Sequence, residues 1–287
     1  MVLVQELWAY CIYKHTMQII DAHTHIFPDS YAAAVLQSTA KMFNVPTFGK
    51  ATASDLLEKM DAEGISFAVI HMVSPTPSGV FDTNTWLIQH PQERFIKFGT
   101  LHPLFKNCED EIKRLKCGGV KGVKFQPDVQ QFTPDDRLNC YHMYEALVKQ
   151  GLTVMFHVGG EPLPSPRDRS KPGMILQIAR DFPDLKIIAA HLGGLNMWQD
   201  VYEKLAGMPN VYMESSLSYK YIEPVLAEKI IRKHGHDKIF FGTDYPFGDI
   251  KTSLAAAKSV PFLTEQEKED ILGRNAWKFF SGMNKQD

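Results

Sequence analysis

Eight short apolar segments rich in β-branched and aromatic residues recur along the chain, and most are separated by a stretch of helical character. The eight segments are Met17–His25, Phe67–Val73, Phe95–His102, Val120–Gln126, Leu152–Val158, Lys186–His191, Val211–Leu217 and Lys238–Thr243. Strands that alternate with helices and are apolar on both faces are typical of a parallel sheet. Eight such units predict an α/β fold, a single (β/α)8 TIM-type barrel. An open doubly wound sheet usually carries a G-x-G-x-x-G turn after its first strand, and this sequence has none.

Capping residues predict where some helices begin and end. Thr133 followed by Pro134 is expected to start a helix as N-cap and first helical residue, and Gly151 is expected to end it. Thr264 with Glu267 resembles the capping box of a second helix. The apolar face of the first helix is predicted to contain Leu138, Tyr141, Tyr144 and Val148.

The segment after the first predicted strand, residues 26–51, is longer than a usual β/α connection. It contains a predicted short helix over Tyr31–Met42. Long connections at this end of a barrel usually shape the active site, so we expect this segment to contribute to it.

A length of 287 residues suits either two domains or one large barrel. We expect one barrel domain over residues 17–287, because no Pro-, Ser- or Gly-rich linker divides the chain. Residues 1–16 are interpreted as an N-terminal extension, since they lack the basic start and the cleavage site of a signal peptide. Whether Met17 is the natural first residue stays open.

Composition excludes several classes of partner. The net charge of −2, from 31 Lys+Arg and 33 Asp+Glu, gives no basic surface for a nucleic acid. No segment approaches the roughly 18 uninterrupted apolar residues of a membrane span. The four cysteines form no C-x-x-C pair, which favours a reduced, cytoplasmic setting.

Two histidines near the end of the first predicted strand form an H-x-H pair. His23 and His25 are two residues apart, so on a strand both imidazoles face the same side. Two convergent imidazoles suit a divalent metal such as Zn²⁺. The spacing alone is weak, because His234 and His236 repeat it in a charged turn that we interpret as a solvated loop.

Further polar residues fall at the C-terminal ends of other predicted strands, where barrel enzymes gather their reacting groups. His157 ends the fifth strand, His191 the sixth, and Asp244 follows the eighth. Any one of them could be a hydrogen-bonded core residue. A buried carboxylate is costly unless it is paired or metal-bound, and the coincidence of five such groups favours a single site.

The ordered motifs resemble the amidohydrolase superfamily. They are D-x-H-x-H at residues 21–25, the histidine at 157, His-Leu-Gly-Gly at 191–194 and Gly-Thr-Asp-Tyr-Pro at 242–246. More narrowly they resemble the "amidohydrolase 2" branch, which includes aminocarboxymuconate-semialdehyde decarboxylase, resorcylate-type decarboxylases and dicarboxylate lactonases. Residues 271–280 are similar to the closing helix of that branch.

The resemblance implies one divalent metal held by His23, His25, His157 and Asp244, most often zinc and in some members manganese. It implies that His191 holds or polarises a water at the metal rather than serving as a ligand. In binuclear relatives a carboxylated lysine of the fourth strand bridges two metals. Lys124 is on that strand, but this branch does not use the bridge, so a second metal is not expected.

The first functional hypothesis is a metal-dependent hydrolase of an amide, lactone or ester bond in a small molecule. It would use metal-activated water, with Asp244 and His191 as proton-transfer groups. The alternative is a non-oxidative decarboxylase or hydratase of a carboxylated small molecule at the same mononuclear site. An inactive barrel that only binds its ligand is a third reading, which the intact motif residues disfavour. We expect a homodimer on resemblance alone.

Four residues are candidates for substrate contacts. Lys124 ends the fourth strand, and Arg167 and Arg169 lie in the loop after the fifth, where a guanidinium could hold a carboxylate. Trp198 follows His191 and could form a wall of the pocket or pack on a helix.

Other polar residues have less defined roles. His71 and His102 end the second and third strands and could line the pocket, although packing is the simpler interpretation. Asp21 is expected to orient the imidazole of a ligand. Glu214, on the seventh strand, could point inward or outward.

Overall fold

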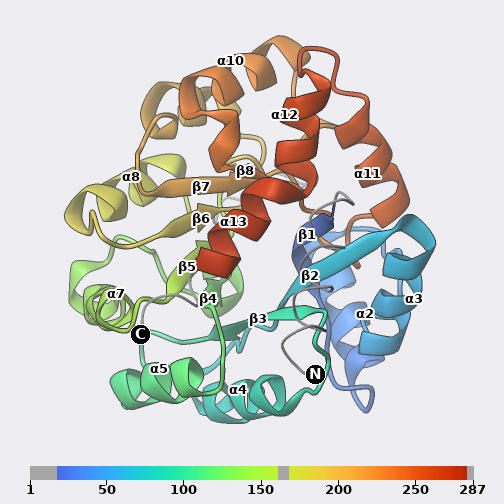
Figure 1. The fold of residues 1–287 in the computed structure, drawn as a ribbon. Helices are drawn as coiled ribbons and strands as arrows, with labels where there is room; N and C mark the ends of the chain where they lie inside the picture. The colour runs from blue at the N-terminus through green and yellow to red at the C-terminus, as the bar shows by residue number, and fades with distance from the viewer. Residues whose placement is uncertain (1–17, 161–167, 283–287) are drawn as a thin grey trace, which may run out of the picture.

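A computed structural model describes residues 18–160 and 168–282. Its eight strands form one parallel sheet in chain order (Figure 1), which confirms the predicted (β/α)8 barrel. The strands are β1 Ile19–His25, β2 Ile65–His71, β3 Phe95–Thr100, β4 Gly122–Phe125, β5 Thr153–Phe156, β6 Ile187–Ala189, β7 Val211–Glu214 and β8 Ile239–Phe240. The expected extension over residues 1–16 and Met17 lie outside the described residues.

Helices surround the sheet and alternate with its strands (Figure 1). They are α2 Ala32–Phe43, α3 Ala53–Glu63, α4 Val80–Gln89, α5 Cys108–Cys117, α6 Pro127–Gln130, α7 Arg137–Gln150, α8 Pro172–Asp181, α9 Trp198–Asp200, α10 Pro224–His234, α11 Ile250–Lys258, α12 Glu265–Glu269 and α13 Asn275–Gly282. Short 3-10 turns, η1 Pro77–Gly79 and η3 His236–Lys238, and π-helical turns, η2 Val201–Leu205 and η4 Asp270–Arg274, complete the connections. None of the described helices is long and apolar enough to cross a membrane.

Backbone hydrogen bonds join the first strand to the last and close the barrel. The amide of Ala22 donates to the carbonyl of Phe241 at 2.8 Å, and the amide of Asp244 donates to the carbonyl of His23 at 2.8 Å. A parallel bridge between Thr24 and Tyr245 continues the contact. The two motifs at opposite ends of the sequence are therefore neighbours in space.

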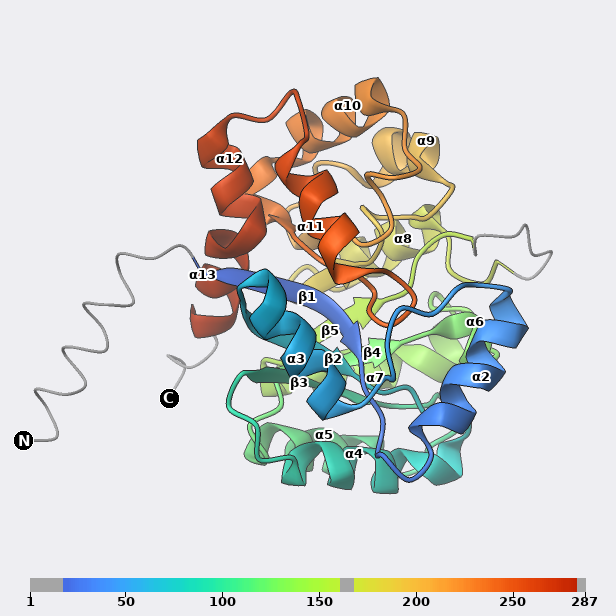
Figure 2. The ribbon, with the colours of Figure 1, turned by 90° about the vertical axis from the view of Figure 1, so that its right-hand side faces the viewer.

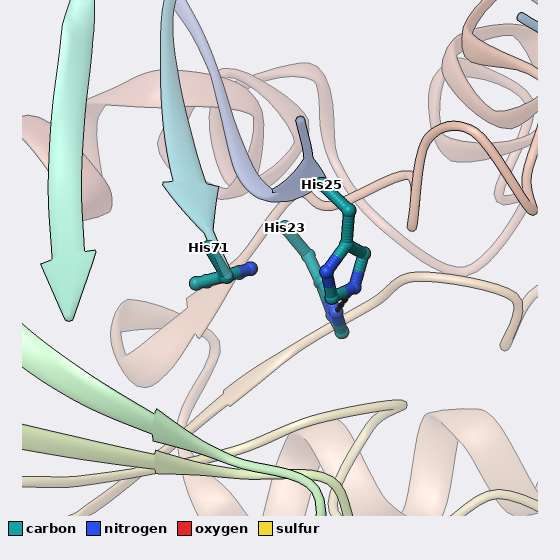
Figure 3. Close-up of side chains that lie close together, drawn as sticks. All are labelled: His23, His25 and His71. Atoms are coloured by element: carbon teal, nitrogen blue, oxygen red, sulfur yellow. Dashed lines mark hydrogen bonds between the residues drawn. The ribbon is translucent and has the colours of Figure 1, made fainter. Parts of the chain in front are cut away.

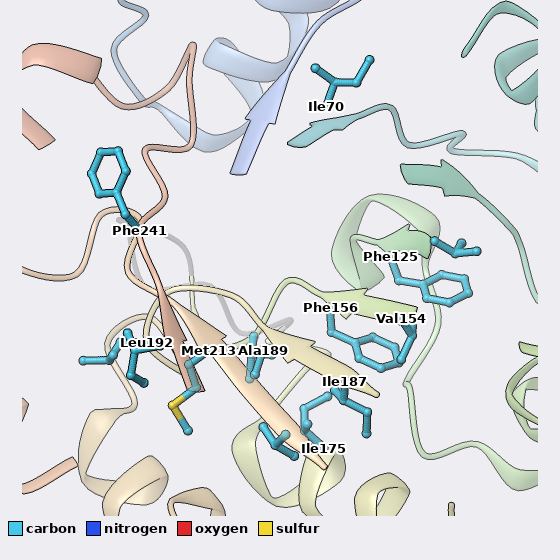
Figure 4. Close-up of a cluster of buried hydrophobic side chains, with 14 of the residues drawn as sticks. Ile70, Phe125, Val154, Phe156, Ile175, Ile187, Ala189, Leu192, Met213 and Phe241 are labelled. Carbon is cyan, nitrogen blue, oxygen red and sulfur yellow. The ribbon is translucent and has the colours of Figure 1, made fainter. Parts of the chain in front are cut away.

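The apolar core has two main parts and a small third cluster of Phe27, Ala32, Ala51 and Met72 beside α2. Side chains inside the barrel, such as Ile20, Phe98 and Phe240, pack against Phe279 and Phe280 of α13. A larger cluster fills the space between the strands and the outer helices (Figure 4). Because α13 lies across one end of the barrel and α2 at the other (Figure 2), only the α2 end, to which the strands point, is left to hold a site.

All the observed strands except β1 end before the predicted apolar runs do. Past the ends of the ladders His191, Leu217 and Asp244 have φ values of +58°, +56° and +62°. These left-handed conformations turn the chain out of the sheet, which is why the polar residues after β6, β7 and β8 face the centre instead of continuing the strand.

Helix α7 begins three residues later than expected. Asp136, not Thr133, is its N-cap, and its carboxylate accepts from the amides of Leu138 and Asn139. Leu138 therefore lies in the first turn and is 87% exposed, so its predicted place on the apolar face is wrong. Gly151 ends the helix and the Thr264–Glu267 capping box is present, both as predicted.

Candidate metal centre

Five of the expected site residues line one cavity at the C-terminal end of the barrel. They are His23, His25, Lys124, His157 and Asp244, from β1, β4, β5 and the turn after β8. The cavity has a volume of about 390 Å³. His191 is buried behind it, with its Nε2 3.0 Å from Nδ1 of His157.

Three of these side chains converge as ligands of one ion would. Nε2 of His23 is 3.1 Å from Nε2 of His25, and Oδ1 of Asp244 is 3.2 Å and 3.1 Å from these two nitrogens. Ligand atoms about 2.1 Å from a single ion lie about 3.0–3.4 Å apart at bond angles of about 90–109°. The donor set therefore fits a divalent metal, and it consists of nitrogen and oxygen ligands only.

The protonation states agree with metal binding. Burial and the Lys124 ammonium hold the pKa of His23 well below its usual value, so the imidazole is neutral. Burial opposes ionisation of Asp244, but His23 and His25 outweigh it and lower the pKa of this carboxyl to about 2. Neutral imidazoles and an ionised carboxylate are the forms that bind a cation.

Glu214 is the partner that orients His23. Its Oε1 lies 2.8 Å from Nδ1 of His23 and accepts the amide of His191 at 2.9 Å, and its Oε2 accepts the amide of Ser216 at 2.7 Å. This fixes the His23 ring with Nε2 toward the cavity. A Cβ on Gly242 would lie only 2.1 Å from Oε2 of Glu214, so the carboxylate fits because position 242 is glycine.

Glu214 thus has the role that we expected of Asp21, and that expectation is wrong. Asp21 is fully buried and accepts the amide of His23 at 3.1 Å and the hydroxyl of Thr243 at 2.6 Å. Burial raises the pKa of Asp21 to about 7 against these hydrogen bonds. Its side chain joins β1 to the turn after β8 through hydrogen bonds and does not contact an imidazole nitrogen.

Hydrogen bonds hold both the ring and the backbone of His191. Its Nδ1 is 2.9 Å from the hydroxyl of Ser216, and Nε1 of Trp198 donates to its carbonyl at 3.0 Å. Trp198 therefore positions the strained backbone of His191, and it is not among the described residues that line the cavity. Burial lowers the pKa of both His191 and His157, so the imidazole pair is neutral near pH 7.

A third imidazole lies against the H-x-H pair. His71, at the end of β2, is fully buried, and its ring centre is 4.9 Å from that of His23 and 5.3 Å from that of His25 (Figure 3). Neither of its ring nitrogens meets a well-aligned hydrogen-bond partner among the described residues. The ligand atoms of all three histidines lie within 4.8 Å of one another, so this corner of the barrel is rich in nitrogen donors.

His102, His234 and His236 are not among the described residues that line the cavity. Nδ1 of His102 accepts from the amide of Leu104 at 3.2 Å, which stabilises a turn. His234 is buried and accepts from the amide of Gly207 at 3.1 Å, so its assignment to a solvated loop is wrong. His236 is partly exposed, with Nε2 3.4 Å from a carboxylate oxygen of Asp270.

Of the candidate substrate contacts that the structure describes, Lys124 lines the cavity and Arg169 does not. Lys124 is 1% exposed, with Nζ 3.4 Å from Nε2 of His23. Arg169 donates to the side-chain oxygen of Gln131 at 3.2 Å and is not among the described residues that line the cavity. Arg167 lies outside the described residues.

Most of one cavity wall comes from a single continuous segment. Its members lie in or beside α2, where the sequence predicted a helix within a site-forming connection, and they are Phe27, Val35, Thr39, Phe43, Val45, Pro46 and Phe48. Residues after β7, including Ser215, Tyr219 and Lys220, contribute a more polar wall. The cavity therefore suits a small molecule with an apolar body and a few polar groups.

The family model described as "Amidohydrolase" matches residues 20–282. The chain belongs to the amidohydrolase family. A search of curated proteins gives no match.

Solved structures similar to this amidohydrolase cover nearly the whole chain. The structure of 5-carboxyvanillate decarboxylase from Sphingomonas paucimobilis has a TM-score of 0.70 and 15% identity over 93% of this chain and 99% of that one. Dihydroxybenzoic acid decarboxylase from Polaromonas sp. JS666, with bound manganese and the inhibitor 2-nitroresorcinol, has a TM-score of 0.67 and 15% identity over 93% and 97%. A probable 2-pyrone-4,6-dicarboxylic acid hydrolase from Acinetobacter baumannii, with citric acid bound, has a TM-score of 0.67 and 16% identity over 92% and 100%.

Sequence reasoning did not assign a role to two residues of this amidohydrolase site. The orientation of Glu214 was left open, although an acidic residue at the end of an otherwise apolar strand was a usable signal. Ser216, whose hydroxyl lies between Glu214 and His191, has no such signal, because serine is common in loops.

Proposed function

We propose that this amidohydrolase is a metal-dependent, non-oxidative decarboxylase of a small carboxylated molecule with an apolar body. The observation that carries the proposal is the buried ammonium of Lys124, 3.4 Å from Nε2 of His23 at an otherwise largely apolar cavity. A buried ammonium in such surroundings favours an anionic ligand, and a carboxylate fits beside the metal ligands.

The proposed metal ligands are His23, His25, His157 and Asp244. The triangle of His23, His25 and Asp244 supports this set, and His157 lines the same cavity. These residues would hold one divalent ion, which would supply Lewis acidity next to the substrate's carboxylate. Zinc was expected from the sequence, and the manganese in the similar Polaromonas decarboxylase supports manganese as an equal candidate.

The chain's own residues would hold the carboxylate and move the proton. Lys124 orients the carboxylate, and the apolar wall of residues 27–48 holds the body of the substrate. The bond from carbon to carboxylate breaks, carbon dioxide leaves, and the electron pair that stays on carbon takes a proton. Asp244 and the neutral imidazole of His191 would be the proton-transfer groups, as the sequence predicted.

Hydrolysis of an amide, lactone or ester bond, the first hypothesis from the sequence, becomes the second candidate. It uses the same residues, and the similarity to a probable pyrone dicarboxylate hydrolase supports it. The similar solved structures are mostly decarboxylases, which favours decarboxylation. A homodimer and a cytoplasmic enzyme stay predictions from the sequence.

A panel of benzoates, hydroxybenzoates and pyrone carboxylates tests the function. Protein reconstituted with Mn²⁺ or Zn²⁺ is expected to release carbon dioxide from at least one aromatic acid. Lys124→Met should lower kcat/KM at least 100-fold at unchanged metal content, whereas Lys121→Met, a lysine of the same segment outside the cavity lining, should not. Release of an acid from a lactone without carbon dioxide would favour hydrolysis instead, and turnover of neither class would contradict the proposal.

A further inference from the structure

We propose that His71 is a further ligand of the divalent metal and that it makes the site select zinc over manganese. The inference rests on the proposed function and goes beyond its ligand set, which consists of His23, His25, His157 and Asp244. It narrows the choice of metal that the proposed function leaves open.

A fully buried imidazole without a well-aligned partner carries this inference. Both ring nitrogens of His71 are shielded from solvent, and neither meets a well-aligned hydrogen-bond partner among residues 18–160 and 168–282. Buried polar groups are normally hydrogen-bonded or bound to a metal. Packing alone does not explain the residue, because an apolar side chain of similar size would fill the same space without the cost of burying two polar atoms.

The sheet places His71 directly beside the H-x-H pair. His71 is the register partner of His25 in the parallel pairing of β1 with β2. The ligand nitrogens of His23, His25 and His71 all lie within 4.8 Å of one another, and one ring nitrogen of His71 is on the side that faces the pair (Figure 3). Ligands on opposite sides of one ion, each at about 2.1 Å, are about 4.2 Å apart. Small side-chain shifts therefore suffice for the three imidazoles to share an ion.

The surroundings of the ring agree with a role as ligand. Phe98 packs against His71 edge to face, with the ring centres 5.7 Å apart, and it offers no hydrogen-bond acceptor in the ring plane. Burial, followed by the charges of His23 and Lys124, holds the pKa of His71 well below its usual value. The imidazole is therefore neutral and keeps the lone pair that a metal needs.

An added imidazole changes which metal the site prefers. Imidazole nitrogen suits zinc, whereas carboxylate and water oxygens suit manganese, and zinc binds nitrogen donors more tightly than manganese does. With His71 the proposed set contains four imidazoles and one carboxylate. Loss of His71 should therefore cost zinc more affinity than it costs manganese.

The affinities of the wild type and of His71→Leu for Zn²⁺ and Mn²⁺, measured by competition with a chelator, test the inference. We expect His71→Leu to bind Zn²⁺ about 100-fold more weakly and Mn²⁺ no more than about tenfold more weakly. His71→Gln, which is polar but has no imidazole, should also lose most of the preference for zinc. His234→Leu is the matched control, because it removes an equally buried imidazole that does not line the cavity, and it should bind both ions as the wild type does.

X-ray absorption of the zinc-loaded wild type needs no variant and should count four imidazoles around the ion. A count of three or fewer would overturn the inference, and so would a folded His71→Leu protein that binds both ions as the wild type does or loses equal affinity for both. In these cases the decarboxylase proposal stands, because release of carbon dioxide is measured independently of His71. If the wild type binds neither ion, the proposed function is contradicted and the role of His71 with it.

Discussion

At the scale of single residues, Glu214 determines how the H-x-H pair is presented. One carboxylate accepts from the His23 ring and from two backbone amides, of His191 and Ser216, so it joins β1, β6 and β7 at one point. A hydrogen-bond partner of this kind sets both the orientation and the basicity of an imidazole.

Replacing Glu214 by glutamine tests this role. Glu214→Gln keeps the shape of the side chain but loses its charge, so we expect the affinity for Zn²⁺ or Mn²⁺ to fall about 10- to 100-fold. Competition with a chelator measures the affinity. Glu203→Gln, on an exposed turn, serves as the control and should bind metal as the wild type does. Equal affinity in both variants would assign Glu214 to packing alone.

The site was predictable at the residue scale where topology alone decides position. His23, His25, His157 and Asp244 were expected to lie together, and all four line one cavity, because strand ends in a barrel converge whatever their neighbours are. Side-chain direction was less predictable. The register between β1 and β2 shifts between Asp21 and Thr24, so simple alternation does not say which way Asp21 points. For Trp198 and Arg169 the sequence left a cavity contact and a packing or loop role open, because loop conformation is not encoded in a periodic pattern.

At the scale of elements, the junction between β1 and the turn after β8 depends on a buried threonine. Thr243 donates its hydroxyl to Asp21 at 2.6 Å and accepts the amide of Tyr245 at 3.1 Å. The junction therefore brings Asp244 beside the H-x-H pair.

Removing that hydroxyl should weaken the junction. Thr243→Val leaves a buried amide and a carboxylate oxygen without their partner, so we expect the free energy of unfolding to fall by about 1.5–3 kcal/mol. Urea unfolding measures the change. Thr76→Val, at an exposed position, should change stability by less than about 0.5 kcal/mol. A loss of similar size in both variants would argue against the junction.

The N-terminus of α12 predicts a pH dependence. A salt bridge from Arg232, followed by the amide of Thr264, lowers the pKa of Glu267 to about 2 from a usual 4.5. A lowered carboxyl pKa adds stability that is complete above pH 4.5 and is lost as the pH falls toward 2.

Glu267→Gln checks the sign of this effect. At pH 7 it should lower the free energy of unfolding by about 1 kcal/mol, the usual value of a helix cap. The difference from the wild type should shrink as the pH falls from 5 toward 2, in denaturant unfolding at each pH. A difference that stays constant over this range would show that the charge contributes nothing. Glu265→Gln at the same helix end, 87% exposed, is the control.

The elements themselves were more predictable than their ends. All eight strands were found because buried parallel strands are apolar over their whole length. The start of α7 was not predicted correctly, because two possible N-cap residues, Thr133 and Asp136, lie within one turn. Asp136 is the N-cap, because its carboxylate accepts hydrogen bonds from two backbone amides.

At the scale of the whole molecule, the proposed ligands come from β1, β5 and the turn after β8. An ion bound there would cross-link the two ends of the sequence. Binding to the folded state alone adds about 2.7 kcal/mol at a metal concentration of about 100 times Kd.

Metal removal should therefore lower the melting temperature. We expect a Tm lower by about 4–5 °C after chelation, restored by Mn²⁺ or Zn²⁺, from the usual relation of free energy to Tm in chains of this size. Calorimetry measures the Tm with and without the metal. His25→Ala should abolish the difference, while His142→Ala, on the exposed side of α7, should retain it. A Tm indifferent to metal in the wild type would contradict the ligand set.

The wall made by residues 27–48 has a consequence for how such an enzyme can diversify. The imidazoles and carboxylates are dispersed over the whole barrel, but the apolar wall is one uninterrupted stretch of chain. Most of the residues expected to contact the apolar body of a substrate are thus contiguous in the sequence, whereas the proposed metal ligands are not. Replacing this one stretch would change the apolar wall and leave the proposed ligands in place.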